Sequence, residues 1–116
     1  MTTTVLVADD QADIRRIYAE VLTSKGFAVV SARDGIEAIS KFKEQRPDIV
    51  VLDNNMPGCT GLEAASEILA IHSSAKVIMV SADEQAHQEA NRLGVDLFLT
   101  KPVSVKKFIE SVEIER

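Results

Sequence analysis

Short runs of consecutive apolar residues alternate five times with longer segments in which apolar residues recur every three or four positions. The short runs predict strands at residues 4–8, 27–32, 49–52 and 77–81, and a fifth strand within residues 95–99. These runs show little polar alternation, which is typical of strands buried on both faces of a sheet. The pattern therefore predicts one α/β domain with a parallel sheet and helices on both sides.

The longer segments predict five helices, each with one apolar stripe. The first ends at Lys25-Gly26, the second starts at Asp34-Gly35, and the third follows Gly61. The fourth covers Glu84–Leu93 and has a weak apolar face, and the fifth begins near Ser104 as its N-cap. The residues expected to face the core are Ile14, Ile17, Tyr18, Val21 and Leu22; Ile36, Ile39 and Phe42; Leu62, Ala65, Ile68 and Leu69; Ala86, Ala90 and Leu93; and Val105, Phe108, Ile109 and Val112.

Four of the predicted strands end at residues that can handle phosphate or a divalent cation. Asp9-Asp10 follow the first strand, Asp53 follows the third, Ser81 ends the fourth, and Lys101 follows the fifth. Sites in open α/β sheets form beyond the carboxyl ends of the strands, so one sheet would gather these residues into one pocket. Taken alone, an Asp after a strand is more often a turn or a helix cap. The ordered set on four strand ends predicts a site that accepts a phosphoryl group.

The three carboxylates of Asp9, Asp10 and Asp53 would lie close enough to raise one another's pKa. A divalent cation relieves this repulsion, and hard oxygen ligands in an open site favour Mg²⁺. The backbone carbonyl of Asn55, in the loop after Asp53, could supply a further ligand. The sequence therefore predicts a Mg²⁺ site at this edge of the sheet.

One carboxylate of the set can act as a nucleophile, because carboxylates attack phosphorus to form acyl phosphates. Asp53 is the candidate acceptor, since it ends the central apolar run. The ammonium of Lys101 and the hydroxyl of Ser81 can then stabilise the phosphoryl oxygens, together with the cation.

Composition limits the partners. The net charge of −5 argues against non-specific binding to nucleic acid or to an anionic membrane. No apolar stretch approaches the roughly 18 residues of a membrane span, and the N-terminus lacks the pattern of a signal peptide. Cys59, the only cysteine, fits a reducing cytoplasm. His72 and His87 have no partner at metal-ligand spacing and are expected to be surface helix residues.

With these residues in place, the chain resembles the receiver domains of two-component response regulators over essentially its whole length, residues 1–116. The resemblance implies a flavodoxin-like fold, a (βα)5 three-layer sandwich with strand order 2-1-3-4-5. The motifs that carry it are Asp9-Asp10, Leu52-Asp53, Met56-Pro57, Gly61, Ser81-Ala82, Phe98 and Lys101-Pro102.

The resemblance implies that Asp53 accepts a phosphoryl group from a sensor histidine kinase or a phosphotransfer protein. It implies a Mg²⁺ ion held by Asp10, Asp53 and the Asn55 carbonyl, with Asp9 acting partly through water. The chain would catalyse only its own phosphorylation and dephosphorylation, and would not be an enzyme with a separate substrate.

The resemblance also implies a switch made of Ser81 and Phe98, read out on the face of the fourth helix, fifth strand and fifth helix. It implies a cis peptide bond between Lys101 and Pro102. An output domain, an effector protein and a phosphorylation-dependent homodimer remain open as partners. Leu97 stands where many DNA-binding members carry an acidic residue of a dimer salt bridge, which argues against that dimer. Thr60 replaces a common Asp before Gly61 and can still cap the helix.

Three other functions are open to a chain of this α/β topology, and a specific residue pattern counts against each. A phosphatase of the haloacid-dehalogenase type would need a second Asp two residues after the nucleophile, where this chain has Asn55. A flavin-binding electron carrier would need a phosphate-cradling loop after the first strand, where Asp9-Asp10-Gln11 would repel phosphate. A degenerate receiver would lack part of the acid set, which is complete here.

Overall fold

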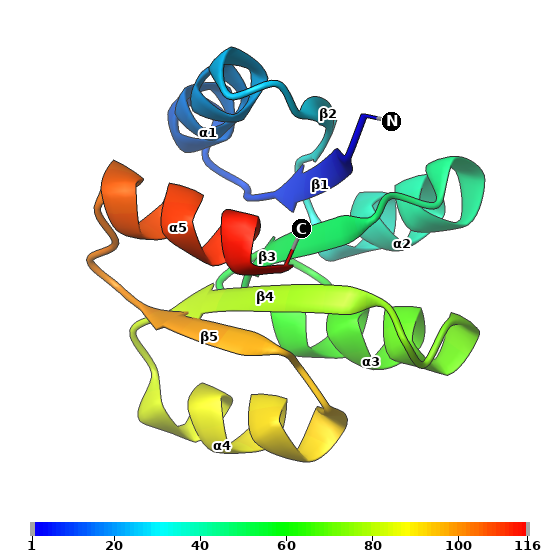
Figure 1. The fold of residues 1–116 in the computed structure, drawn as a ribbon. Coiled ribbons are helices and arrows are strands. Elements are labelled where there is room, and N and C mark those ends of the chain that lie inside the picture. Colours follow the sequence, from blue (N-terminus) through cyan, green and yellow to red (C-terminus); the bar gives the residue numbers. More distant parts are fainter. Residues whose placement is uncertain (1, 116) are drawn as a thin grey trace.

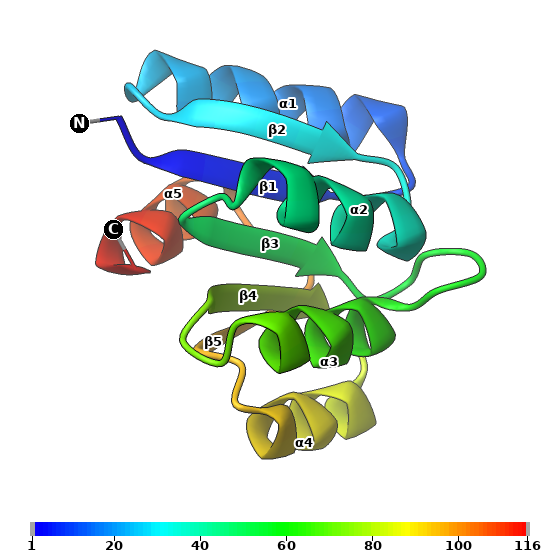
Figure 2. The same cartoon turned by 90° about the vertical axis from the view of Figure 1, so that its right-hand side faces the viewer.

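The computed structural model describes residues 2–115 and contains a five-stranded parallel sheet between two layers of helices (Figures 1 and 2). The strand order is β2-β1-β3-β4-β5, which confirms the expected flavodoxin-like three-layer sandwich. The elements follow one another as β1 (Thr4–Ala8), α1 (Ala12–Ser24), β2 (Ala28–Ala32), α2 (Gly35–Gln45), β3 (Ile49–Asp53), α3 (Gly61–Ile71), β4 (Lys76–Ser81), α4 (Glu84–Leu93), β5 (Leu97–Thr100) and α5 (Val105–Glu115).

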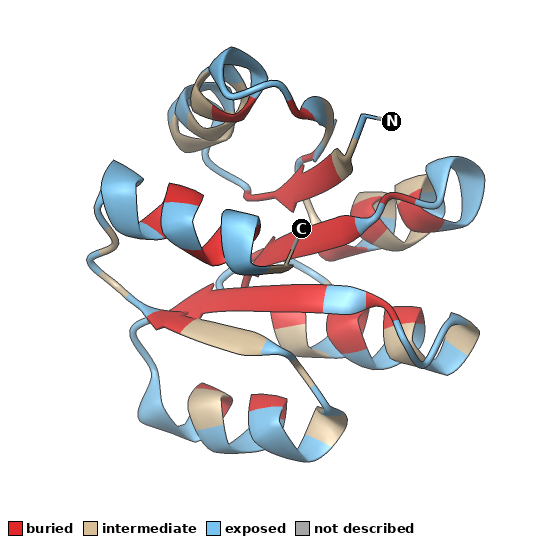
Figure 3. Ribbon diagram, viewed as in Figure 1, coloured by how far each residue is buried: buried red, intermediate tan, exposed pale blue. Residues whose placement is uncertain are grey.

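The two faces of the sheet bury separate cores, because successive side chains of a strand point to opposite sides. On β3, Val50 and Leu52 pack with α2, α3 and α4, whereas Ile49 and Val51 pack with α1 and α5. The strands β1, β3 and β4 are buried almost throughout, as Figure 3 shows. Burial on both faces explains why their sequences read as continuous apolar runs.

Helix ends follow the sequence signals. The Asp34 carboxylate accepts the Glu37 N–H at 2.8 Å at the start of α2, and the Ser104 hydroxyl accepts the Lys107 N–H at 3.1 Å at the start of α5. Gly94 ends α4 with a φ of +90°, a conformation that glycine adopts without steric cost. None of the helices in residues 2–115 combines the length and apolar character that crossing a membrane requires.

Some inward-facing assignments were wrong. Ile17, Ile36 and Val105 are 41%, 68% and 45% exposed. On α2 the buried residues are Gly35, Ala38 and Phe42, and Ile36 lies about 100° around the helix from Gly35.

The expected strand ends also shift by one or two residues: β2 begins after Phe27, β3 and β5 extend to Asp53 and Thr100, and β4 begins at Lys76. The first helical residue of α3 is Gly61 itself.

Candidate functional site

The carboxyl ends of β1, β3, β4 and β5 meet at one edge of the sheet. Asp53 is the last residue of β3, and Ser81 is the last residue of β4. Asp9 directly follows β1, and Lys101 directly follows β5. Parallel pairing brings these ends together, since Ala8 is in register with Leu52 and Ser81 with Thr100. The sheet therefore positions the acidic and basic groups that the sequence placed at strand ends.

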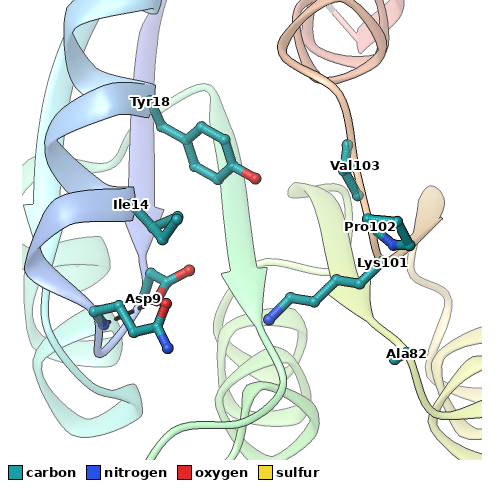
Figure 4. A pocket seen from close by; sticks show the side chains of 8 residues that line it. Asp9, Ile14, Tyr18, Ala82, Lys101, Pro102 and Val103 are labelled. Atoms are coloured by element: carbon teal, nitrogen blue, oxygen red, sulfur yellow. Dashed lines mark hydrogen bonds between the residues drawn. The ribbon is translucent and has the colours of Figure 1, made fainter.

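Asp53 is the buried centre of the site, and only 3% of its surface is exposed. Its Oδ1 atom makes no hydrogen bond of good geometry within residues 2–115, although the Lys101 Nζ atom lies 2.8 Å away as an ion pair. The Lys101 side chain is 37% exposed, so it reaches the carboxylate from the surface. Figure 4 shows it extending toward the end of β3. The Asp53 carboxylate therefore has an oxygen lone pair available for a further ligand.

Asp9 and Asp10 complete an acidic cluster with Asp53, in which one carboxylate oxygen from each residue lies within 4.8 Å of the others. Asp9 is 4% exposed and Asp10 is exposed. The Gln11 N–H donates to Asp9 Oδ1 at 2.9 Å, and the Arg15 guanidinium donates to the Asp9 carbonyl at 2.7 Å. These two bonds fix the turn between β1 and α1, so the carboxylates are held together by the backbone.

Burial and the neighbouring charges shift the acid–base behaviour of the site. Burial raises the pKa of Asp9, the Gln11 hydrogen bond opposes this effect, and the charge of Asp53 adds to it. Burial by itself lowers the pKa of Lys101, but its ion pair with Asp53, with a smaller effect from the charge of Asp9, raises the pKa overall. Lys101 is therefore a cation at neutral pH. The peptide bond between Lys101 and Pro102 is cis, as expected.

The donor set fits a divalent cation. The three carboxylates are hard oxygen donors, and the buried Asp53 Oδ1 has the Lys101 ion pair but no hydrogen bond among the residues that the structure describes. The exposed Asn55 lies in the loop after β3, two residues past Asp53, and no hydrogen bond within residues 2–115 is made to its carbonyl oxygen. One lysine does not balance three clustered carboxylates, so the acidic cluster is a site that could bind a metal ion.

Ser81 is adjacent to the cluster, but its hydroxyl already has a partner. Ser81 is fully buried, and its Oγ accepts the Asp83 N–H at 3.0 Å. Its carbonyl accepts the Lys101 N–H at 3.1 Å, which ties β4 to the residue that contacts Asp53. The hydroxyl proton is not used in the bond to Asp83 and is free for a second acceptor.

Phe98 lies apart from the carboxylates, on the edge strand β5. It is half-buried, and its ring is stacked on that of His87 in α4. The expectation that His87 is a simple surface residue was therefore incomplete, whereas His72 is exposed at the end of α3. Helical periodicity gives the face on which His87 lies, but it does not reveal which ring that face meets.

A cavity of about 460 Å³ opens beside the site, between α1 and the segment after β5 (Figure 4). Tyr18 of α1, expected only as a core residue, lies at this cavity and stacks on Phe108 with ring centroids 3.9 Å apart. Burial, followed by the charge of Asp9, raises the pKa of its hydroxyl. The cavity walls join charged and apolar groups, namely Asp9, Gln11, Ile14, Tyr18, Ala82, Lys101, Pro102 and Val103.

Comparison with known proteins gives the same family as the fold and the site. Residues 5–113 match the family model of the response regulator receiver domain. The chain is 37% identical over 111 residues to the chemotaxis protein CheY of Thermotoga maritima, covering 93% of this chain and 92% of that protein. It is 38% identical over 112 residues to CheY of Listeria monocytogenes, covering 94% of each.

A solved structure extends the likeness to three dimensions. The CheY of a CheX–CheY–BeF3–Mg complex from Borrelia burgdorferi superposes with a TM-score of 0.90 at 33% identity, covering 97% of this chain and 87% of that one. The chain belongs to the receiver domain family of two-component response regulators.

Proposed function

We propose that this receiver domain is a phosphorylation-operated switch whose acceptor is Asp53. The observation that carries the proposal is the buried Asp53 carboxylate, with Lys101 Nζ at 2.8 Å and two further carboxylates beside it. A carboxylate in this position can take a phosphoryl group whose oxygens then meet a fixed cation. The haloacid-dehalogenase alternative has no support, since Asn55 cannot act as its second acid.

The acceptor would react through two successive displacements at phosphorus. In the first, an oxygen of Asp53 bonds to the phosphorus, and the bond from phosphorus to a nitrogen of a phosphohistidine breaks. The imidazole leaves and takes up a proton. In the second, water attacks the phosphorus, the bond to Asp53 oxygen breaks, and inorganic phosphate leaves. The chain restores its own carboxylate, so it acts on no separate substrate.

The ligands for Mg²⁺ would be Asp10, Asp53 and the Asn55 carbonyl, with Asp9 acting partly through water. When bound, Mg²⁺ supplies positive charge to the non-bridging phosphoryl oxygens. Lys101 neutralises another oxygen, and the free proton of the Ser81 hydroxyl can be donated to a third. Mg²⁺ and Lys101 would then both offset the negative charge of the phosphoryl group.

The phosphorylated state would be relayed through the face made by α4, β5 and α5. Ser81 is bonded to Asp83 at the start of α4, so a Ser81 hydroxyl that turns toward the phosphoryl group disturbs that helix. Phe98, on the neighbouring strand, can then turn inward behind Ser81. This is a population shift between two existing arrangements.

The phosphodonor would be a sensor histidine kinase or a histidine phosphotransfer protein. The cavity beside Asp9 and Lys101 supports this, because Ile14 and Val103 offer apolar contacts at the approach to the site.

We place the chain in the cytoplasm, acting through an output domain or an effector protein. A phosphorylation-dependent homodimer is a further outcome of the same switch, and direct nucleic-acid or membrane binding is not part of the proposal.

Acetyl phosphate tests the acceptor directly. In the presence of Mg²⁺ the intact mass of the wild-type chain should increase by one phosphoryl group, while Asp53→Asn should remain unmodified. Asp13→Asn, which removes an exposed carboxylate of α1, is the matched control and should be phosphorylated normally. Equal phosphorylation of Asp53→Asn and wild type would reject Asp53 as the acceptor.

A further inference from the structure

Asn54, the residue after the acceptor, makes hydrogen bonds through both its backbone and its side chain. It is 9% exposed, although it lies outside the strand. Its backbone N–H donates to the Val80 carbonyl at 3.0 Å, so it continues the pairing of β3 with β4 for one more residue. The start of the loop is therefore fixed to the sheet directly beside Asp53.

Asn54 also holds the beginning of α3. Its backbone carbonyl accepts the Gly61 N–H at 3.2 Å, and its side-chain Oδ1 accepts the Leu62 N–H at 3.1 Å. These are two of the N–H groups that a helix leaves without partners in its first turn. Thr60 accepts the next one, that of Glu63, at 3.2 Å. Asn54 and Thr60 thus each provide one side-chain oxygen that accepts a backbone N–H of the same helix end.

The contact between this helix end and the acceptor is very close. A Cβ atom on Gly61 would lie 2.6 Å from the Asp53 carbonyl oxygen and 2.8 Å from the Asn54 Cα atom. Only a glycine fits without moving one of the two backbones. The start of α3 therefore rests directly on the backbone of the acceptor and of Asn54.

The loop between these anchors carries Asn55. The carbonyl of Asn54 accepts the Met56 N–H at 3.0 Å as well as the Gly61 N–H, so both ends of the loop are bonded to one residue. Asn55 lies between Asn54 and Met56, with its carbonyl fixed in direction by the tight turn.

We infer that Asn54 is a positioning residue, whose side chain clamps α3 to the acceptor strand and thereby aims the Asn55 carbonyl at the metal. The inference rests on the proposed function, because that function assigns the carbonyl to Mg²⁺. Loss of the Oδ1 bond leaves the Leu62 N–H without its acceptor and frees the loop to move relative to Asp53. Metal affinity should then fall, while the carboxylates themselves are unchanged.

The test compares Asn54→Leu with Thr60→Ala. Each variant removes one side-chain oxygen that accepts an N–H at the start of α3, but only Asn54 is itself the residue beside the acceptor. Tyr18, the only tyrosine in a chain without tryptophan, lies beside the site, and its fluorescence can report Mg²⁺ binding. Urea unfolding in chelator measures the stability loss of both variants, and Asn54→Ala serves as a second variant should leucine prove too large.

Asn54→Leu should raise the Kd for Mg²⁺ at least about threefold, as expected for the loss of one buried hydrogen bond. Thr60→Ala should keep the wild-type Kd despite a comparable loss of stability. At saturating Mg²⁺ the phosphorylation rate of Asn54→Leu should return to within about twofold of wild type. An unchanged Kd in both Asn54 variants, or an equal change in Thr60→Ala, would overturn the inference alone. A wild-type chain that binds no Mg²⁺ would overturn the proposed function as well.

Discussion

The imidazole of His87 lies flat on the phenyl ring of Phe98, with ring centroids 4.4 Å apart and 10° between the ring planes. His87 belongs to α4 and Phe98 to β5, so the stack joins the helix to the edge strand. A stacked aromatic pair contributes about 0.5–1.5 kcal/mol beyond the area it buries. In the proposed relay Phe98 would have to leave this stack in order to turn inward behind Ser81, so we expect the stack to stabilise the unphosphorylated arrangement.

Removing the stack should favour activation. His87→Ala is expected to speed phosphorylation by acetyl phosphate about two- to tenfold, which corresponds to the free energy of the lost ring contact. The rate is measured from intact mass against time. Gln88→Ala, which changes the next and exposed residue of α4, is the control and should react at the wild-type rate. Equal rates in the two variants would show that His87 does not restrain Phe98.

Lys101 should be required for both reactivity and stability. Lys101→Met removes the cation 2.8 Å from Asp53 and should slow phosphorylation by at least about 100-fold, as for loss of a preorganised charge partner. It also leaves Asp53 buried without a counter-charge. We expect the free energy of unfolding to fall by about 1–2 kcal/mol, discounted because Lys101 is partly exposed.

A double variant separates these two effects. Combining Lys101→Met with Asp53→Asn should restore most of the lost stability, because the buried charge is gone, but should restore no phosphorylation. Lys107→Met, an exposed lysine of α5, should change neither quantity. A Lys101→Met chain that is as stable as wild type in chelator would mean that the ion pair contributes nothing to the fold.

Most of the fold could be predicted from the sequence because the central strands are buried on both faces. Residues 49–52 and 77–80 are continuous apolar runs for that reason, and their ends were placed within one residue. The strand order could not be predicted from periodicity, since which strands pair depends on packing between distant segments. It came from the resemblance to receiver domains, and the structure confirmed it.

The site could be predicted as a set of residues but not as a set of contacts. Asp53 and Lys101 were found because each ends or follows a strand, and parallel strands share one carboxyl edge. The sequence did not predict three contacts of the site. They are the hydrogen bond from the Asp83 N–H to Ser81, the stacking of His87 on Phe98, and the hydrogen bond from the Leu62 N–H to Asn54. These contacts join neighbouring elements or a loop to a helix end, where no sequence period applies.

The acidic cluster should make stability depend on pH and metal. Burial raises the pKa of Asp9 above its ordinary value of 3.8, the Gln11 hydrogen bond opposes the rise, and the charge of Asp53 adds to it. A raised pKa means that the folded chain favours protonated Asp9. The resulting contribution to stability is full below pH 3.8 and is lost as the pH rises through the folded pKa.

At pH 7 in chelator, Asp9→Asn should therefore raise the free energy of unfolding, by about 0.5–2 kcal/mol, as is common when a functional charge is removed. Mg²⁺ should stabilise wild type more than the variant and so reduce or reverse the difference. Urea unfolding with and without Mg²⁺ measures both effects. Glu20→Gln, an exposed acid of α1, is the control. A wild-type chain whose stability is unaffected by Mg²⁺ would contradict the assignment of the cluster as a metal site.

The acyl phosphate should hydrolyse without a partner, on a scale of about seconds to tens of minutes. Asn55 and Asp83 are both exposed, and they lie two residues after Asp53 and Ser81 respectively. We therefore expect them to flank the path by which water reaches the phosphoryl group. Asn55→Arg keeps the backbone carbonyl but adds a bulky side chain, and it should lengthen the lifetime about threefold or more. The decay is followed by intact mass after removal of acetyl phosphate. The control variant Asn55→Ala should not lengthen the lifetime of the acyl phosphate. An unchanged lifetime in Asn55→Arg would show that water does not reach the phosphoryl group past residue 55.

Phosphorylation should loosen or rearrange α4 more than α1 or α2. Its buried residues are only Ala86 and Ala90, so little apolar area holds it to the sheet. Asp83, the N-cap residue of α4, donates its N–H to the Ser81 hydroxyl, which links the helix to the acceptor site. In the proposed relay, a movement of the Ser81 hydroxyl toward the phosphoryl group would therefore reach this helix.

Amide hydrogen exchange with a beryllofluoride mimic on Asp53 measures this response. Exchange should change most in residues 83–94 and around Phe98, and least in α1 and α2. The Asp53→Asn chain, treated in the same way, should show no change and controls for effects of the reagent. If the largest change falls in α2 while residues 83–94 stay constant, the relay through α4 and β5 is wrong even though Asp53 remains the acceptor.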